Sequence, residues 1–307
     1  MLDEADVKAP DPTDFRHART LMEVHRPDVP FAGRTAVLAT KHRKLRLIAP
    51  PMRPLGMDVT AVAVDTDELG TFTGEVPRPG PPLETAIAKA RLGMAATGSA
   101  LGLASEGSVG PHPTIPLVTA DIELVVLVDA ERDLVVSASA TSLDIRAVTR
   151  SLEPGGDPTD LLDRFGLPGH AVIVRPNQGP PTPLFKGLRV PADIATAVVD
   201  CAAASPDGRA RVETDLRAHM CPSRRPTIRL AAERLAARLA TGCPACTSPG
   251  WGCVDVITGI PCRWCGTPTD ELRAEVDGCP ACGHREERAT IATNTTGDPA
   301  RCQRCNP

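Results

Sequence analysis

The first 240 residues alternate between short apolar runs and longer segments in which apolar residues recur every three or four positions. Apolar runs rich in Ala, Val and Leu lie at residues 35–40, 58–65 and 101–105. The helical pattern is clearest just before the third run, with apolar residues at Leu83, Ile87, Ala90 and Met94. Gly98 follows that segment and is placed to end a helix. The pattern predicts strands that alternate with helices.

Beyond residue 120 the pattern changes to paired extended runs. Residues 121–140 contain two apolar stretches separated by polar turn residues, which predicts an antiparallel hairpin. A further strand is expected at residues 170–176, and helical spacing returns at residues 192–204 and 226–240. Strands that alternate with helices, with a hairpin inserted, predict an α/β fold. We expect one mixed sheet covered by helices over residues 31–240.

The two ends of the chain differ from this central part. From residue 241 apolar periodicity fades and pairs of cysteines take over, which marks a second domain at residues 241–307. Residues 1–30 contain several acidic residues and prolines, and we expect a loose N-terminal segment there. That start lacks the basic and apolar stretches of a signal peptide, and no apolar run approaches the roughly 18 residues of a membrane helix. We therefore expect a cytoplasmic protein with reduced thiols and no membrane partner.

Eight cysteines of the second domain form four C-x2-C pairs. The pairs are Cys243 and Cys246, Cys262 and Cys265, Cys279 and Cys282, and Cys302 and Cys305. A C-x2-C turn presents two thiolates to one ion, and the gaps between the first and second pairs and between the third and fourth pairs fit zinc-ribbon spacing. We expect a small double zinc-ribbon domain with two structural Zn2+ ions, one held by the first two pairs and one by the last two. An interleaved arrangement, in which the first and third pairs share an ion, is the less favoured alternative.

The charge of the chain limits its partners. A net charge of −4 gives no overall basic field, so the sequence does not favour a nucleic acid as the main partner. The second domain contains six arginines and eight acidic residues, and two tryptophans are its aromatic residues. It therefore lacks the features of a phosphate-binding or base-stacking surface and suits structural support or protein binding better.

Charged residues gather where the predicted strands end. The sequence KHRK stands where a strand passes into a helix, so that Lys44 and the first helical amides can hold a phosphate. Glu106 lies among small residues at the end of the third strand, at the sheet edge where α/β proteins bind ligands. Glu84 and Lys89 lie on the preceding helix, and Arg224 precedes the last helix. Two carboxylates with several cations suit Mg2+ and a polyphosphate, and a solvated surface is the alternative interpretation.

Three of these segments, VLAT followed by Lys44, ETAIAKAR and LASEG, resemble the inosine triphosphate pyrophosphatase-like families, which include house-cleaning nucleotide hydrolases. The resemblance implies an inosine triphosphate pyrophosphatase-like α/β fold for the front domain. It also implies that Lys44 and Lys89 contact phosphates, and that Glu84 and Glu106 hold Mg2+ or activate water. The first loop is one residue shorter than the family's Thr-Gly-Asn-x-x-Lys, and the acidic loop offers one acid where those enzymes commonly have two.

A closer resemblance extends from Gly33 almost to the end of the chain. The segments that carry it are DTDELGTFTGE, ASEGSVGPHP, LFKGL, TDLRAHMCPSRR and CQRCNP. They resemble a bacterial family described as a domain of unknown function with the same paired zinc-ribbon tail, and Arg224 takes the position of an Arg in that family.

Two classes of function stay open. The first is a Mg2+-dependent nucleoside triphosphate pyrophosphatase-like enzyme, in which Glu84 and Glu106 are catalytic and Lys44, Lys89 and Arg224 neutralise the phosphates. The second is a non-catalytic module that binds a nucleotide or an RNA end through the front domain and a protein through the zinc ribbons. The enzyme requires that Glu84 and Glu106 share a cleft with Lys44.

Overall fold

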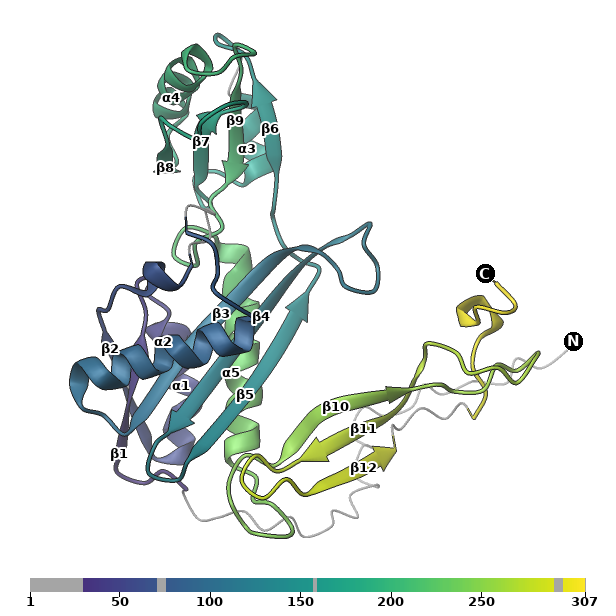
Figure 1. The fold of residues 1–307 in the computed structure, drawn as a ribbon. Coiled ribbons are helices and arrows are strands. Elements are labelled where there is room, and N and C mark those ends of the chain that lie inside the picture. The colour runs from purple at the N-terminus through teal and green to yellow at the C-terminus, as the bar shows by residue number, and fades with distance from the viewer. Residues whose placement is uncertain (1–29, 71–75, 157–158, 290–294, 307) are drawn as a thin grey trace, which may run out of the picture.

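The computed structural model describes residues 30–70, 76–156, 159–289 and 295–306. The loose N-terminal segment expected at residues 1–30 lies outside the described residues except for Pro30. Part of the motif DTDELGTFTGE, residues 71–75, also lies outside them. The described residues form three sheets with their helices (Figure 1).

The first sheet has five strands and is mixed. In spatial order they are β2 (Met57–Val62), β1 (Arg34–Ala39), β3 (Leu101–Pro111), β4 (Thr119–Asp129) and β5 (Leu134–Ser142). β1 pairs in parallel with β2 along its whole length and with β3 at Val37 and Leu38. β3, β4 and β5 form a long antiparallel meander. The predicted strands and hairpin of the front domain are present in this sheet.

Helices cover both faces of the five-stranded sheet (Figure 1). The helices are α1 (Leu45–Met52), α2 (Pro82–Thr97) and α5 (Arg225–Leu239). Successive side chains of β3 point to opposite faces, so Leu103 joins the core under α1 and α5, and Ala104 joins a smaller core under α2. This alternation also sends the neighbouring polar residues Ser105 and Glu106, in the middle of β3, to opposite faces.

A second sheet, which the sequence pattern does not predict, lies within residues 149–214. Its antiparallel strands, in spatial order, are β6 (Thr149–Leu152), β9 (Ala210–Thr214), β7 (Val172–Pro176) and β8 (Phe185–Leu188). It carries α3 (Thr159–Phe165) and α4 (Pro191–Ala203), and Val174, Ile194 and Val212 belong to its own core. The pattern correctly predicts a strand near β7 and a helix near α4, but they belong to this sheet and not to the mixed one. The short strands around them carry little periodicity.

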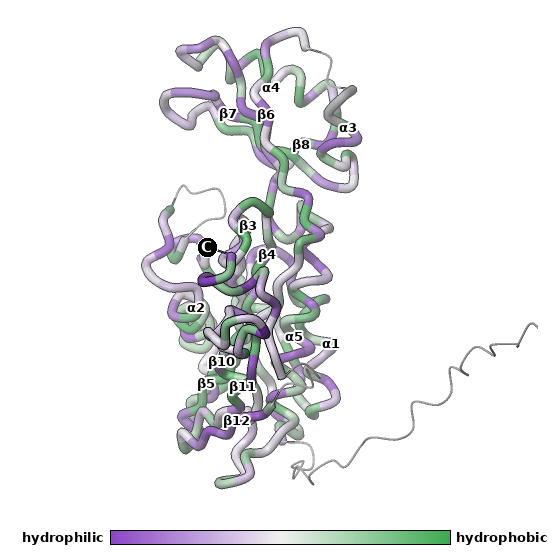
Figure 2. Tube along the Cα trace, turned by 90° about the vertical axis from the view of Figure 1, so that its right-hand side faces the viewer, coloured by the Kyte–Doolittle hydropathy of each residue, from purple (hydrophilic) through white to green (hydrophobic). Residues whose placement is uncertain are grey.

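The third sheet lies in the cysteine-rich part of the chain. Its antiparallel strands are β10 (Gly252–Thr258), β11 (Leu272–Gly278) and β12 (Arg285–Ala289), in that order. Many of its side chains are exposed, and β12, which is exposed along its whole length, is mostly hydrophilic (Figure 2). Arg238 of α5 donates to the carbonyl oxygens of Ser137 and Gly250, at 2.6 and 2.9 Å, and so fastens this part to β5.

The remaining helical segments are short 3-10 turns: η1 (Arg53–Leu55), η2 (Thr66–Leu69), η3 (Pro222–Arg224) and η4 (Pro299–Arg301). Across the described residues, every helix is too short or too polar to cross a bilayer.

Candidate functional site

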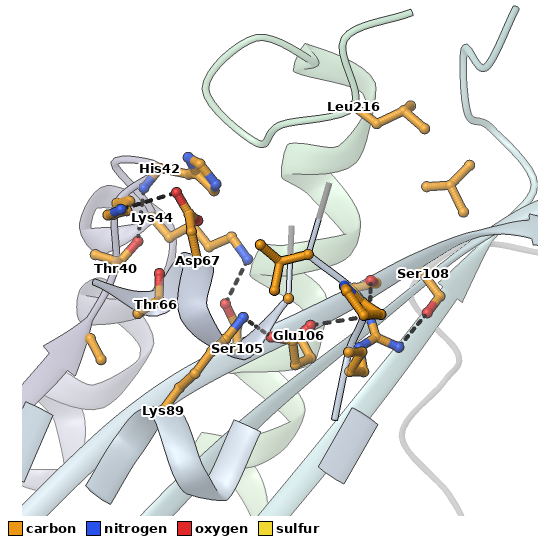
Figure 3. A pocket seen from close by; sticks show the side chains of 18 residues that line it. Thr40, His42, Lys44, Thr66, Asp67, Lys89, Ser105, Glu106, Ser108 and Leu216 are labelled. Carbon is orange, nitrogen blue, oxygen red and sulfur yellow. Dashed lines mark hydrogen bonds and ion pairs between the residues drawn. The ribbon is translucent and has the colours of Figure 1, made fainter. Parts of the chain in front are cut away.

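A cavity of about 330 Å³ opens at the carboxyl end of β1, beside residues 105–109 of β3. The prediction that the third strand ends at Glu106 is wrong, because β3 stays paired with β4 as far as Pro111 and Glu106 lies within it. With the sheet order β2-β1-β3, the chain goes from β1 to β2 on one side and then crosses to β3 on the other side of β1. The carboxyl end of β1 is therefore a topological switch point, the usual ligand site of an open α/β sheet. The lining includes Lys41, Lys44, Arg78 and Lys89 together with the acids Asp67 and Glu106 (Figure 3). The described lining thus carries more positive than negative charge.

Lys44 is the buried cation of this pocket. It is 7% exposed and stands immediately before α1. Its Nζ donates to the Ser105 hydroxyl at 2.8 Å (Figure 3). Among the described residues, no carboxylate lies within ion-pair distance of Lys44. Burial lowers the pKa of Lys44 to about 8, against the opposing influence of Glu123 and Glu106.

Glu106 lies between two cations. One carboxylate oxygen contacts Lys89 Nζ, and the other accepts from Arg78 at 3.2 Å. Arg78 also donates to the carbonyl of Gly107 at 3.0 Å and to the Ser108 hydroxyl at 3.3 Å. Glu106 is therefore neutralised within the protein. The structure brings Lys44, Lys89 and Glu106 together as the sequence predicts.

Arg78 is a pocket residue that the sequence analysis misses. It lies in a stretch rich in proline and glycine, where no periodicity marks a functional position. Its position between Pro77 and Pro79, just before α2, is the available signal, because the two prolines restrict the backbone on either side of it.

Glu84 does not join this group. It is exposed, on the first turn of α2, and is not part of the described pocket lining. Glu84 and Lys89 are five residues apart on one helix, so their side chains point about 140° from each other. Lys89 reaches the pocket, and the same helix geometry turns Glu84 away from it.

Arg224 lies beneath the pocket and is fully buried. Its Nε donates to Glu123 at 2.8 Å, a second nitrogen contacts the same carboxylate, and Asp121 lies 3.6 Å away. Burial raises the pKa of Glu123 to about 7 despite Arg224 and Lys44. Arg224 therefore serves a buried charge network behind Lys44 and does not itself line the described pocket.

The rim of the pocket is formed by the loop after β1. Lys41 forms ion pairs with Asp65 and Asp67, at 2.5 and 3.0 Å. The His42 ring stacks on that of His219, with ring centroids 5.1 Å apart. Burial lowers the pKa of His42 to about 4, with Lys44 acting in the same direction. His42 is therefore neutral at physiological pH and leaves Lys41, Arg43 and Lys44 as the cations of the loop.

Two groups of four cysteines can each hold a metal ion. One contains Cys243, Cys246, Cys279 and Cys282, and the other contains Cys262, Cys265, Cys302 and Cys305. The sulfur–sulfur distances that span the pairs are 3.8 and 3.6 Å in the first group, and 3.9 and 3.5 Å in the second. A tetrahedral ion with bonds of about 2.3 Å requires sulfurs about 3.8 Å apart. The thiols are free, and their spacing fits one such ion per group.

The sequential wiring that we expect from the spacing is wrong, and the interleaved alternative is correct. Gly252 at the start of β10 lies opposite Gly278 at the end of β11, so the first and third pairs meet at one end of the ladder. The second pair follows β10, about 20 Å along the strand from the first. A bridge between Cys262 and Gly297 brings the fourth pair back to the second. The length of the strands therefore decides which cysteine pairs share an ion, and the spacing of the cysteines does not contain that length.

Hydrogen bonding favours the thiolate form of one cysteine in each group. The Ser248 hydroxyl lowers the pKa of Cys246 to about 6. The hydroxyl of Thr267 lowers the pKa of Cys265 to about 6 in the same way. Thiolates are the form that binds a metal, so both groups are chemically suited to the role that their geometry indicates.

Residues 89–307 match a family described as a domain of unknown function, DUF6671. The matched part begins inside α2 and includes β3, the second sheet and both cysteine groups. Lys44 and the strands β1 and β2 precede it. No curated protein matches the chain closely enough to count as a relative.

Proposed function

Because the chain belongs to the DUF6671 family, whose description states no activity, its function follows from its sites, and we propose that the pocket beside β1 binds a phosphorylated small molecule. A nucleotide is the class that the sequence resemblance favours. The observation that carries the proposal is Lys44: a buried ammonium at a ligand-sized pocket, with a hydroxyl partner and no carboxylate partner among the described residues.

A phosphate group would satisfy several groups of this pocket together. Lys44 would gain its missing anion, and the first amides of α1, which begins at Leu45, would add donors. Lys89 and Arg78 lie on the other side of Ser105 and would shift part of their pairing from Glu106 to the ligand. The arrangement therefore offers cations from three separate segments to one anionic group.

Hydrolysis assisted by Mg2+ has weaker support. Both oxygens of Glu106 already face cations, and Glu84 lies outside the described lining. The residues present therefore do not fit a magnesium ion held by Glu84 and Glu106. We place ligand binding ahead of catalysis for this reason.

The two cysteine groups support a separate structural proposal. We propose that each holds one Zn2+, because four thiolates at tetrahedral spacing are the ligands that zinc prefers. All four positions are taken by cysteine, which leaves no open position for a substrate. The ions would hold the small third sheet in place. This cysteine-rich part, residues 241–307, would then offer the sheet as a binding surface for a protein partner.

The test is a calorimetric titration of the zinc-loaded full chain with pyrophosphate and with nucleoside mono-, di- and triphosphates. Lys44→Gln is expected to weaken binding at least tenfold, because it removes the positive charge and leaves a shorter, neutral polar side chain. Arg46→Gln is the matched control, since Arg46 is exposed on α1 and is not part of the described lining. Absence of binding, or equal affinity in Lys44→Gln, would overturn the proposal.

A parallel assay measures pyrophosphate release with Mg2+ in the wild type and in Glu106→Gln. Pyrophosphate release that depends on Glu106 would support the hydrolase interpretation. Tight binding without release would support a binding module.

A further inference from the structure

Five arginines surround the loop of residues 215–225, beside the pocket. We call them the basic face: Arg43, Arg146, Arg189, Arg217 and Arg225. They come from the β1–α1 loop, the link between β5 and β6, the end of β8, the loop after β9 and the start of α5. Arg43, Arg146 and Arg225 are exposed, and the other two are half-buried. A chain with a net charge of −4 therefore concentrates positive charge at one place.

Direct contacts hold these arginines around the loop. Arg225 donates to the carbonyl of His219 at 3.2 Å, and Arg189 donates to the sulfur of Met220 at 3.4 Å. Arg146 reaches the loop through its backbone amide, which donates to the Ser223 hydroxyl at 3.2 Å, while its guanidinium donates to the carbonyls of Asp163 and Arg164. Arg189 and Arg225 therefore contact the loop with their guanidinium groups, and Arg146 stands beside them.

The basic face is continuous with the pocket. His219 in the centre of the loop stacks on His42, which lines the pocket. Arg43 lies between His42 and Lys44 in the chain. Burial first, and then Arg217, lowers the pKa of His219, with Arg43 and Arg189 acting in the same direction. These arginines are therefore close enough to His219 to act on it electrostatically.

Acidic residues cancel only part of this charge. Asp215 is buried and pairs with Arg217 through two oxygens. Asp144 lines a shallow cavity together with Arg146. The surface that remains at Arg43, Arg189 and Arg225 is cationic, and it continues outward from a site that holds one phosphate under the proposal above.

We propose that the basic face binds a single-stranded nucleic acid whose terminal phosphate occupies the Lys44 pocket. This inference rests on the proposed function of that pocket. A polynucleotide fits because it follows its terminal phosphate with further phosphates, and the arginine fork suits each of them. Recognition would depend on the backbone and not on the bases, because the described pocket lining contains no Phe or Trp.

The test compares two ligands on the zinc-loaded full chain by fluorescence anisotropy and competition. One is a twelve-nucleotide RNA with a 5′-phosphate and a 3′ dye, and the other is the matching nucleoside monophosphate. We expect the RNA to bind at least tenfold more tightly at low salt. Its log affinity should fall against log salt by about 0.7 for each phosphate contacted.

The double variant Arg189→Gln/Arg225→Gln separates this inference from the function of the pocket. We expect at least tenfold weaker RNA binding and unchanged binding of the monophosphate. Arg46→Gln/Arg229→Gln, with the same loss of charge at exposed positions outside the basic face, should change neither. Thermal unfolding of both variants checks that they fold.

Each outcome distinguishes the two proposals. If the RNA binds no more tightly than the monophosphate, the proposal for the basic face is overturned and the proposed function of the pocket stands. Tight RNA binding that is unchanged in Arg189→Gln/Arg225→Gln would also overturn the proposal that the basic face binds RNA. If neither ligand binds, both the proposal for the basic face and the proposed function of the pocket are overturned. Displacement of RNA by poly-glutamate at equal charge concentration would identify an acidic protein as the partner instead.

Discussion

Arg224 and Glu123 form an ion pair in which neither side chain reaches solvent. Two nitrogens of the guanidinium contact one carboxylate oxygen of Glu123, which lies 101 positions earlier in the chain. Asp121, also fully buried, lies 3.6 Å from the same guanidinium. Two acids on β4 therefore share one arginine at the start of α5. The last helix is thereby tied electrostatically to the centre of the sheet.

Replacing this arginine alone should be costly. We expect Arg224→Met to lower the free energy of unfolding by about 3–5 kcal/mol, because it leaves buried acids without their cation. Urea denaturation measures the change. Arg229→Met, at an exposed arginine of the same helix, serves as the control and should change stability by less than about 1 kcal/mol. Equal stability of the two variants would contradict the role assigned to Arg224.

Gly107 makes room for this pair. A Cβ at Gly107 would lie 2.2 Å from an Arg224 nitrogen and 2.6 Å from a Glu123 oxygen. Gly107→Ala should therefore destabilise the protein by about 3 kcal/mol, at the upper end for overpacking. Gly110→Ala on the same strand is the matched control, because a Cβ there meets nothing within 4 Å. A thermal shift assay that finds both variants alike would show that the pair moves aside at little cost.

The sequence predicts the pocket better than it predicts what lies behind it. Lys44, Lys89 and Glu106 meet where β1 ends, because β3, its parallel neighbour, continues past that end and α2 packs against β3. The order of the elements is enough to place a ligand site there. The contacts of Arg224 cannot be predicted in this way, because they depend on where α5 packs against the sheet. No local sequence pattern contains that information. Glu84 is excluded by helix geometry, which the spacing to Lys89 already contains. The second sheet escapes prediction since its core is assembled from strands of four or five residues.

The cysteine pairs show the same division. A C-x2-C spacing determines that each turn offers two thiolates to one ion. The partner of each turn depends on the strand between them, and β10 and β11 carry the chain from one metal group to the other and back. Spacing alone favours the sequential wiring, because neighbouring turns are the nearest in sequence and not in space.

Metal content tests the interleaved wiring directly. The double variant Cys243→Ser/Cys279→Ser should lose one equivalent of zinc, because both cysteines belong to one group. Cys243→Ser/Cys262→Ser should lose two, since it damages both groups. Mass spectrometry of the purified proteins for zinc gives the counts. Sequential wiring predicts the opposite result for the two variants.

Thr247 occupies a strained position in the first cysteine turn. Its φ is 62°, whereas the corresponding positions of two other cysteine turns are held by Gly266 and Gly283, each with φ of 73°. Left-handed backbone is unfavourable for a β-branched residue and free for glycine. We expect Thr247→Gly to raise the stability of the metal-loaded protein by about 1 kcal/mol. This figure is the backbone strain that the substitution relieves, reduced by the extra conformational entropy that glycine loses on folding.

The reciprocal change completes that test. Gly266→Thr should lower stability by about 1–2 kcal/mol. Thermal unfolding with excess zinc measures both variants. A loss of stability in Thr247→Gly would mean that the hydrogen bond from the Thr247 hydroxyl to the carbonyl of Cys246, at 2.6 Å, outweighs the strain.

The affinity for phosphate should depend on pH through Lys44. Burial lowers the pKa of Lys44 to about 8, and a bound anion would raise it because the charged form is favoured beside a phosphate. Below pH 8 Lys44 is protonated with or without ligand, so its contribution to affinity is constant. Above that pH the free protein loses the proton that the complex retains, and affinity should fall by up to about tenfold per pH unit.

Pyrophosphate titrations from pH 7 to pH 9.5 measure this fall, and Lys44→Arg separates it from the titration of the ligand. Arginine keeps its charge over the whole range, so the variant should report the ionisation of pyrophosphate alone. The difference between the two profiles belongs to Lys44. Identical profiles would show that the Lys44 ammonium does not contact the anion, and the pocket would then lose the residue on which its proposed function depends.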